Sequence, residues 1–106
     1  MSLKDYQEKT DNWMKSLNVE EPYWKPLEIM ARLSEETGEV ARELNHLYGP
    51  KKVYGRGDLE KLEDEMADII VTLICLANSQ KINLDKAMER VFEKINSRDT
   101  ERFKKK

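Results

Sequence analysis

The sequence predicts an all-α protein of four helices, and three observations carry this prediction. Apolar residues recur at intervals of three and four through four segments, which is the period of an amphipathic helix. Pro22, Pro26 and the pair Gly49–Pro50 fall between these segments, where they break helices. The third segment contains an apolar run, residues 69–77, that is typical of a buried helix. With 106 residues, we expect one domain, 1–106, with a modest core.

The composition excludes several classes of protein. Nineteen basic and 21 acidic residues leave a net charge of −2, which argues against a strongly basic nucleic-acid binder. The single cysteine, Cys75, provides neither a disulfide framework nor zinc-ligand spacing, and favours a reducing compartment. The apolar run is far shorter than the roughly 20 residues of a membrane span. We therefore expect a cytoplasmic protein whose partners are neither membranes nor polymeric nucleic acid.

The first helix is expected from Ser2 to about Asn18. Ser2 followed by Asp5 has the pattern of a capping box, in which each side chain accepts a hydrogen bond from the other residue's backbone. The apolar stripe of this helix consists of Leu3, Tyr6, Thr10, Trp13, Met14 and Leu17. An aromatic connector, 22–26, follows, and its second proline suits the first turn of the next helix.

Two tryptophans in this region admit two interpretations. Trp13 belongs to the stripe of the first helix, and Trp24 belongs to the connector. Aromatic side chains at helical spacing usually pack in a core. Either indole could instead stack on a flat ligand such as a nucleobase, and the sequence leaves both interpretations open.

The second helix is expected from Pro26 to Tyr48, because Gly49–Pro50 ends it. Its apolar face consists of Met30, Leu33, Thr37, Ala41, Leu44 and Tyr48. Another side of the same helix is acidic and has no nearby basic residue; it carries Glu35, Glu36, Glu39 and Glu43. Such a side is either a solvated surface or a place for a cation.

The third helix is expected within residues 62–80, and its apolar side chains point all round its axis. One thin polar stripe interrupts them, made of Glu65, Asp68, Thr72 and Ser79. Carboxylates are rarely buried unless they are paired, protonated or bound to metal. These acids are therefore expected to meet Lys or Arg from a neighbouring helix, or else to bind a cation.

A loop joins the second and third helices, which should therefore run antiparallel. This loop, 51–58, is basic and glycine-containing, and we interpret it as a solvated turn in preference to a phosphate-gathering lid. Each helix carries two acids at i and i+3, Glu36 with Glu39 and Glu65 with Asp68, so both acids of a pair share one side. If the two pairs face each other, four carboxylates converge.

The fourth helix is expected to begin after Asn83, its N-cap, and to end near Ser97. Its apolar stripe is Leu84, Ala87, Met88, Val91, Phe92 and Ile95. Lys94 and Arg98 lie at i and i+4, where they either bind one anion together or complement the helix dipole. The tail, 99–106, is expected to be frayed.

The chemistry of four converging carboxylates favours a hard divalent cation. Oxygen donors with no His or Cys beside them suit Mg²⁺, with Mn²⁺ as an alternative, better than zinc or copper. Mg²⁺ usually shares its ligands with the phosphates of a substrate. Four carboxylates and a triphosphate together carry so much negative charge that we expect more than one ion per site.

These motifs resemble a known family. Residues 35–39 (EETGE), then 25 residues, then residues 65–68 (EMAD), are similar to the E-E-x-x-E, spacer, E-x-x-D signature of the MazG-type all-α nucleoside triphosphate pyrophosphohydrolases. The resemblance extends from about Met30 to Arg98 and includes a K-x-x-x-R pattern near the end of the last helix. It covers most of the chain, and both acidic pairs occur at the spacing of the signature.

The resemblance implies a four-helix-bundle core assembled as a homodimer or homotetramer. It also implies Mg²⁺-dependent hydrolysis of a nucleoside triphosphate to a monophosphate and pyrophosphate, in nucleotide-pool cleaning, with the sugar and base left open. By position, the implied metal ligands are Glu36, Glu39, Glu65 and Asp68, and the implied catalytic residues are Glu35 and Glu36. The implied phosphate-binding residues are Lys94, Arg98 and Asn96, and the candidates for stacking on the base are Trp13 and Trp24.

Two other hypotheses remain beside this one. A di-iron carboxylate bundle needs two Glu-x-x-His motifs, and the chain offers one, Glu43 to His46. His46 near a helix end is also a simple partner of the helix dipole. The other hypothesis is a non-enzymatic helical interaction or dimerisation module, in which the acids form a solvated face.

Overall fold

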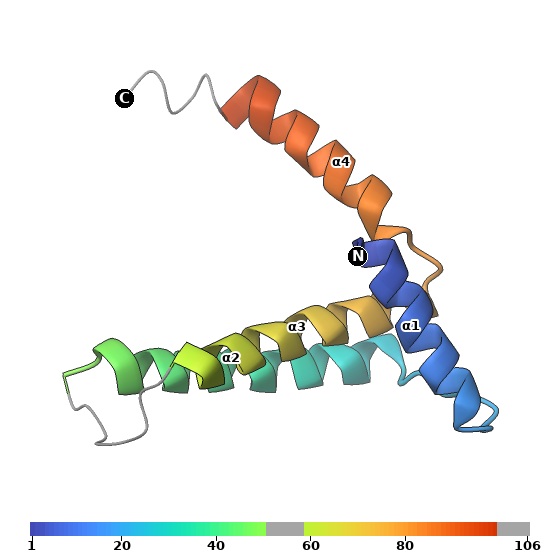
Figure 1. The fold of residues 1–106 in the computed structure, drawn as a ribbon, viewed down its shortest axis with the longest axis horizontal. Helices are drawn as coiled ribbons and strands as arrows, with labels where there is room; N and C mark the ends of the chain where they lie inside the picture. The colour runs from blue at the N-terminus through green and yellow to red at the C-terminus, as the bar shows by residue number, and fades with distance from the viewer. Residues whose placement is uncertain (51–58, 100–106) are drawn as a thin grey trace.

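The computed structural model describes residues 1–50 and 59–99, and within these ranges the all-α prediction is confirmed. The helices are α1 (Leu3–Ser16), α2 (Pro26–Tyr48), α3 (Leu59–Ser79) and α4 (Leu84–Lys94), followed by a π-helical turn, η1 (Ile95–Asp99) (Figure 1). The expectations for the basic loop 51–58 and for the tail beyond residue 99 lie outside the described residues. In the described part of the chain, no helix combines the length and hydropathy needed to cross a membrane.

The ends of α1 follow from local backbone chemistry. The Ser2 hydroxyl accepts a hydrogen bond from the Asp5 amide at 3.1 Å, and the Asp5 carboxylate accepts one from the Ser2 amide at 2.9 Å. The predicted capping box is therefore confirmed. The helix ends at Ser16, slightly earlier than predicted, because Asn18 adopts the left-handed conformation with φ of 54° that terminates helices.

The bounds predicted for α2 are confirmed at both ends. Pro26 occupies the first turn, where its missing N–H costs no hydrogen bond, and the Glu28 carboxylate accepts a hydrogen bond from the Lys25 amide at 3.3 Å. Gly49 caps the other end by donating its amide to the Asn45 carbonyl at 2.9 Å. The helix thus presents one unbroken face to α3.

Helices α2 and α3 run antiparallel and form the most extensive contact in the described structure (Figure 1). The buried apolar residues are Ile29 of α2 with Ile74 and Ala77 of α3, so the core lies at the end of the pair that α1 covers. Helix α3 is not covered on all sides within the single chain. Its exposed apolar side chains include Met66, Ile70, Val71 and Leu73.

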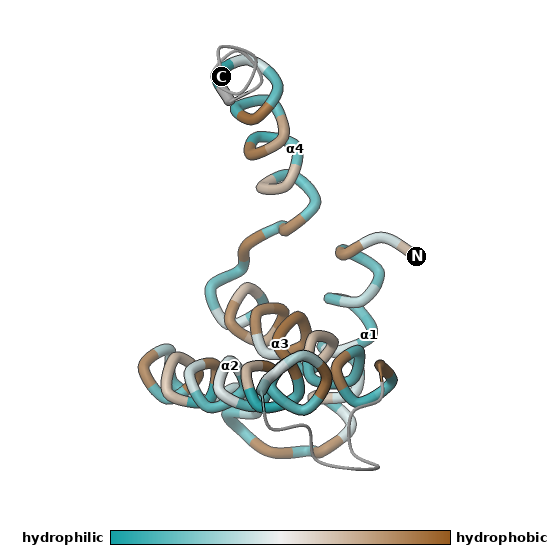
Figure 2. The backbone as a smooth tube through the Cα atoms, turned by 90° about the vertical axis from the view of Figure 1, so that its left-hand side faces the viewer, coloured by the Kyte–Doolittle hydropathy of each residue, from teal (hydrophilic) through white to brown (hydrophobic). Residues whose placement is uncertain are grey.

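Helix α4 extends away from the α2–α3 pair, and apart from the turn η1 that continues it, its main contact is with α1 (Figure 1). The radius of gyration is consequently 17.4 Å, against about 13 Å for a compact domain of this length. The apolar stripe of α4 lies in solvent: Met88, Val91, Phe92 and Ile95 are exposed. Hydrophobic stretches recur along α3 and α4 in Figure 2. A four-helix core is therefore not closed within one chain.

A hydrogen-bonded clasp fixes the direction in which α4 leaves the core. The Asp85 carboxylate accepts from the amides of Leu3 and Lys4, at 3.2 and 3.4 Å, at the N-terminus of α1. Gln7 of α1 is buried, and its side chain accepts from the Leu84 amide at 3.0 Å and donates to the Ile82 carbonyl at 2.7 Å. The first-turn amides of α1 and α4, which have no partner within their own helices, thus hold the start of α4 against α1.

Replacing Gln7 with Ala is expected to destabilise the protein by about 1 to 3 kcal/mol, because it leaves the Leu84 amide and the Ile82 carbonyl without these partners. Chemical denaturation of Gln7→Ala and of a matched control, Glu8→Ala at an exposed position of the same helix, measures the difference. Equal stability of the two variants would show that the clasp contributes nothing.

Candidate metal and nucleotide site

Polar side chains follow the line along which α2 and α3 pack. On α3, Lys61, Glu65, Asp68 and Thr72 are spaced by four, three and four residues, which aligns them on one side of the helix. On α2, a second line at the same kind of spacing contains Arg32, Glu36, Glu39, Glu43 and His46. We call this double line the polar seam.

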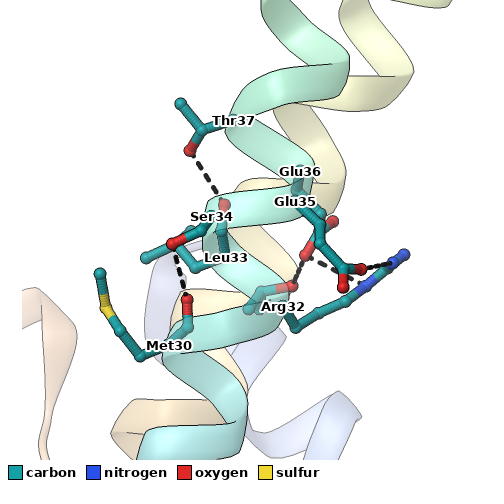
Figure 3. A network of polar contacts seen from close by, with 8 residues as sticks. Met30, Arg32, Leu33, Ser34, Glu35, Glu36 and Thr37 are labelled. Atoms are coloured by element: carbon teal, nitrogen blue, oxygen red, sulfur yellow. Dashed lines mark hydrogen bonds and ion pairs between the residues drawn. The ribbon is translucent and has the colours of Figure 1, made fainter.

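Glu36 is the most deeply buried acid of the polar seam, with 2% of its surface exposed. The hydroxyl of Thr72 on α3 donates a hydrogen bond to its carboxylate. Arg32, one turn earlier on α2, brings its Nε to 3.7 Å from Glu36 and an Nη to 3.2 Å from the exposed carboxylate of Glu35 (Figure 3). The interpretation that this side of α2 has no nearby base is therefore wrong.

Glu39 and Glu65 bring two carboxylates together across the polar seam. The pKa of Glu65 is raised by a hydrogen bond to Glu39, by burial, and by the negative charges of Glu39 and Asp68, while Arg42 opposes the shift. Two carboxylates can share a hydrogen bond only when one of them carries a proton. Oε2 of Glu65 is buried, and no group in the described ranges donates a hydrogen bond to it.

This arrangement fits a cation in part. Like-charged carboxylates that meet without a partner raise each other's pKa, and a divalent ion between them removes that cost. Arg42 is the basic residue whose charge opposes the raised pKa of Glu65. Asp68 is exposed, however, and across residues 1–50 and 59–99 no three His, Cys, Asp or Glu side chains lie close enough to hold a metal as they stand.

The residues expected to bind phosphate lie elsewhere in the single chain. Lys94 ends α4, and Asn96 and Arg98 belong to the turn η1 that continues it, all three exposed. Figure 1 shows this end of α4 projecting away from α2 and α3. The fold therefore does not bring these residues to the acids of the same chain.

An aromatic cavity opens beside the buried end of the polar seam. Its volume is about 200 Å³, and its lining includes Tyr23, Trp24, Arg32, Thr72 and Cys75. Trp24 is 59% exposed, so its ring is available to a ligand. Burial and the hydrogen bond to Asp11 raise the pKa of Tyr23 to about 12, so its hydroxyl remains a protonated donor.

Trp13 does not line this cavity and is also 59% exposed, on α1. Neither tryptophan is therefore packed in a core of the single chain. Trp24 retains a position that suits stacking, whereas the interpretation of Trp13 as a stacking residue has no support from the cavity.

The sequence interpretation missed several residues of this region. Arg32 and Arg42 act on the acids of the polar seam, yet Arg residues on helices are too common for their spacing to reveal such a role. Glu43 belongs to the acidic side that the sequence left open as a solvated surface or a place for a cation, and it is only 5% exposed. Glu43 lies only about 20° around the helix from Glu36. A helical projection shows that the two residues share a side, but it does not show that a neighbouring helix covers that side.

Comparisons with known proteins show the family and the fold of the chain. Residues 25–103 match the model of the MazG nucleotide pyrophosphohydrolase domain. The chain is 43% identical to the YpjD protein of Bacillus subtilis over 105 residues, which is 99% of this chain and 93% of that protein. Its fold is similar to the crystal structure of YpjD, with a TM-score of 0.81, 42% identity, and coverage of 92% of this chain and 97% of that chain.

A second solved structure is similar over nearly the whole chain. The crystal structure of the Bacillus-conserved MazG protein, described as a nucleotide pyrophosphohydrolase, superposes with a TM-score of 0.77 at 39% sequence identity. The match covers 95% of this chain and 96% of that chain.

The meeting of Glu39 and Glu65 predicts a pH dependence of stability in the presence of a chelator. Because the folded-state pKa of Glu65 is raised, the folded protein binds this proton more tightly than the unfolded chain does. The proton on Glu65 stabilises the folded protein fully at pH values below the ordinary carboxyl pKa. This stabilisation is lost as the pH rises through the raised pKa of Glu65. We expect Glu65→Gln to remove this part of the decline in thermal melts between pH 4 and pH 7, about the range in which carboxyl groups titrate.

Glu63→Gln, at an exposed position of the same helix, is the matched control. If the parent, Glu65→Gln and Glu63→Gln show the same pH profile in chelator, the two carboxylates do not repel each other in solution.

Proposed function

Because the chain belongs to the MazG nucleotide pyrophosphohydrolase family, and is thus a hydrolase of nucleotides, we propose that its substrate is a nucleoside triphosphate and its cofactor Mg²⁺. The proposed products are a nucleoside monophosphate and pyrophosphate, and the proposed role is nucleotide-pool cleaning. Mn²⁺ is the alternative ion, with more than one ion per site. Membership of the family argues against the alternative of a non-enzymatic interaction module.

The observation that carries the Mg²⁺ proposal is the meeting of Glu39 and Glu65, where Oε2 of Glu65 is buried without a hydrogen-bond donor in the described ranges. A buried carboxylate oxygen without a donor, facing a second carboxylate, is stabilised by a hard cation that takes oxygen ligands. The residues that would hold the metal are Glu36, Glu39, Glu65 and Asp68. When bound, Mg²⁺ supplies charge neutralisation for the phosphates and a more acidic water.

The residues of the chain itself have separate tasks in this proposal. Glu35 is exposed and is kept in place by Arg32 at 3.2 Å, so its carboxylate can accept a proton from the attacking water. Glu36 is oriented by the Thr72 hydroxyl and by Arg32, which fixes one of its oxygens and leaves the other as a ligand. Binding and proton acceptance thus fall to adjacent residues on α2.

The aromatic cavity supports a site for the nucleobase. Trp24 offers an exposed ring, and the cavity adjoins Arg32 and Thr72, which contact Glu36. Stacking on an aromatic ring tolerates any base, because every base has a π-face. Trp24 is therefore our proposed base-stacking residue, ahead of Trp13.

We further propose that the active unit is a homodimer or homotetramer. The exposed apolar stripe of α4 and the exposed apolar side chains of α3 need cover, and a second copy provides it. The phosphate-binding roles of Lys94, Asn96 and Arg98 then depend on assembly, because α4 of one copy must approach the polar seam of another.

The reaction is tested by its products. We expect parent protein with Mg²⁺ to release pyrophosphate and nucleoside monophosphate from a panel of triphosphates, and to release neither in excess chelator. Asp68→Asn is expected to lose most of this activity, whereas Asp64→Asn, a matched change at an exposed position of α3, retains it. Release of orthophosphate without pyrophosphate would contradict the proposal.

The same variants separate metal binding from folding. Saturating Mg²⁺ should stabilise the parent by about 2.7 kcal/mol at 100 times its Kd. We expect Asp68→Asn to be at least as stable as the parent in chelator, because one negative charge is gone, and to gain little from Mg²⁺ in thermal melts. Strong destabilisation in chelator with full activity would instead indicate a structural ion pair.

Oligomerisation is tested by light scattering. The parent should have the mass of a dimer or tetramer at micromolar concentration, and Phe92→Asp should shift it toward monomer because the charge falls on the exposed apolar stripe. Lys86→Asp, at an exposed position outside that stripe, is the control. A compact, active monomeric parent would contradict the assembly proposal.

A further inference from the structure

A second cavity lies at the opposite end of the polar seam from the aromatic cavity. Its volume is about 390 Å³, and among the described residues it is lined by Arg42, Glu43, His46 and Lys61. Arg42 and Lys61 supply two permanent cations from two different helices, α2 and α3. Neither the family signature nor the proposed metal and base sites assigns a task to this cavity.

Glu43 organises the wall of this cavity. It is 5% exposed, and its carboxylate lies 3.9 Å from Nε of Arg42 and 3.5 Å from Nδ1 of His46. Oε2 of Glu43 and Nδ1 of His46 are both buried, and neither makes a hydrogen bond within the described part of the chain. A buried carboxylate is costly unless it is neutralised, so Glu43 favours the position of the Arg42 guanidinium at this wall.

Arg42 and Lys61, which line the same cavity from two helices, suit an anionic ligand. The imidazole of His46, whose Nδ1 lies 3.5 Å from Glu43, can also donate an N–H to a bound anion. Arg42 keeps further guanidinium N–H groups beyond the one that faces Glu43, and a guanidinium fork matches phosphate oxygens. Phosphate is therefore a better match than an apolar or cationic ligand.

The order of groups along the polar seam gives the anion a place in a larger ligand. Thr72, beside the aromatic cavity, and Lys61, beside the cationic cavity, are separated by eleven positions on one side of α3, about 16 Å at 1.5 Å per residue. Glu65 and Asp68 lie between them. The seam thus runs from aromatic ring, through carboxylates, to cations, in the order in which a nucleotide presents base, metal-bound phosphate and terminal phosphates.

We propose that Arg42, His46 and Lys61 form the subsite for the β- and γ-phosphates, the part of the substrate that leaves as pyrophosphate. This inference rests on the proposed function and adds the direction in which the triphosphate lies. Water forms the new bond to the α-phosphorus, and the bond from that phosphorus to the bridging oxygen breaks. The oxygen departs with its electron pair on pyrophosphate, whose added negative charge the three side chains stabilise.

His46 provides a direct readout, because it is the only histidine in the sequence. In untagged protein with Mg²⁺, titration with pyrophosphate should shift the imidazole NMR signals of His46 saturably, whereas a nucleoside monophosphate should leave them almost unchanged. Arg42→Gln and Lys61→Gln are each expected to weaken the binding of pyrophosphate about tenfold, the loss of one charged hydrogen bond, without weakening that of the monophosphate. Lys9→Gln, at an exposed position of α1, is the matched control.

The outcomes separate this inference from the function on which it rests. Release of pyrophosphate from triphosphates tests the function and does not depend on the His46 signals. If release is observed and these signals ignore pyrophosphate, respond equally to the monophosphate, or respond only to a divalent cation such as Zn²⁺, the subsite is overturned and the function stands. Unchanged pyrophosphate affinity in both Arg42→Gln and Lys61→Gln also overturns it.

Discussion

Two acidic side chains, Glu39 on α2 and Glu65 on α3, meet where the two longest helices pack against each other. The fold stabilises this contact from one end, where Ile29, Ile74 and Ala77 form the buried apolar core. Repulsion between the acids opposes the same packing. A ligand that removes this repulsion stabilises the packing of α2 against α3. The proposed metal would therefore also favour folding.

The same helix pair explains how one short chain offers several binding environments. The polar seam consists of residues spaced by three and four along α2 and α3. It adjoins an aromatic cavity at one end, contains acidic residues in the middle, and adjoins a cationic cavity at the other end. Helix α4 takes no part in this line within the chain, because Gln7 and Asp85 direct it outward from α1. The clasp thus keeps an apolar stripe in solvent, at a cost that assembly would offset.

Features that depend on local sequence were predictable, whereas those that depend on distant contacts were not. Pro26 and Gly49 fix the bounds of α2 through backbone chemistry, so the sequence predicted them correctly. The neighbours that cover α3 could not be predicted, because the period of its apolar residues indicates which sides need cover but not which helices supply it. The deep burial of Glu43 and Gln7 depends on neighbours in three dimensions, and polar residues give no such signal in sequence.

A divalent cation between α2 and α3, at Glu39 and Glu65, is what the proposed function depends on most. The most direct measurement is anomalous diffraction from crystals grown with Mn²⁺, which takes the same oxygen ligands as Mg²⁺ and scatters anomalously. The claim predicts an anomalous peak within coordination distance, roughly 2.0 to 2.2 Å for such ions, of oxygens from both carboxylates. A Mn²⁺-saturated crystal with no peak there, or with its only peak outside the polar seam, would contradict it.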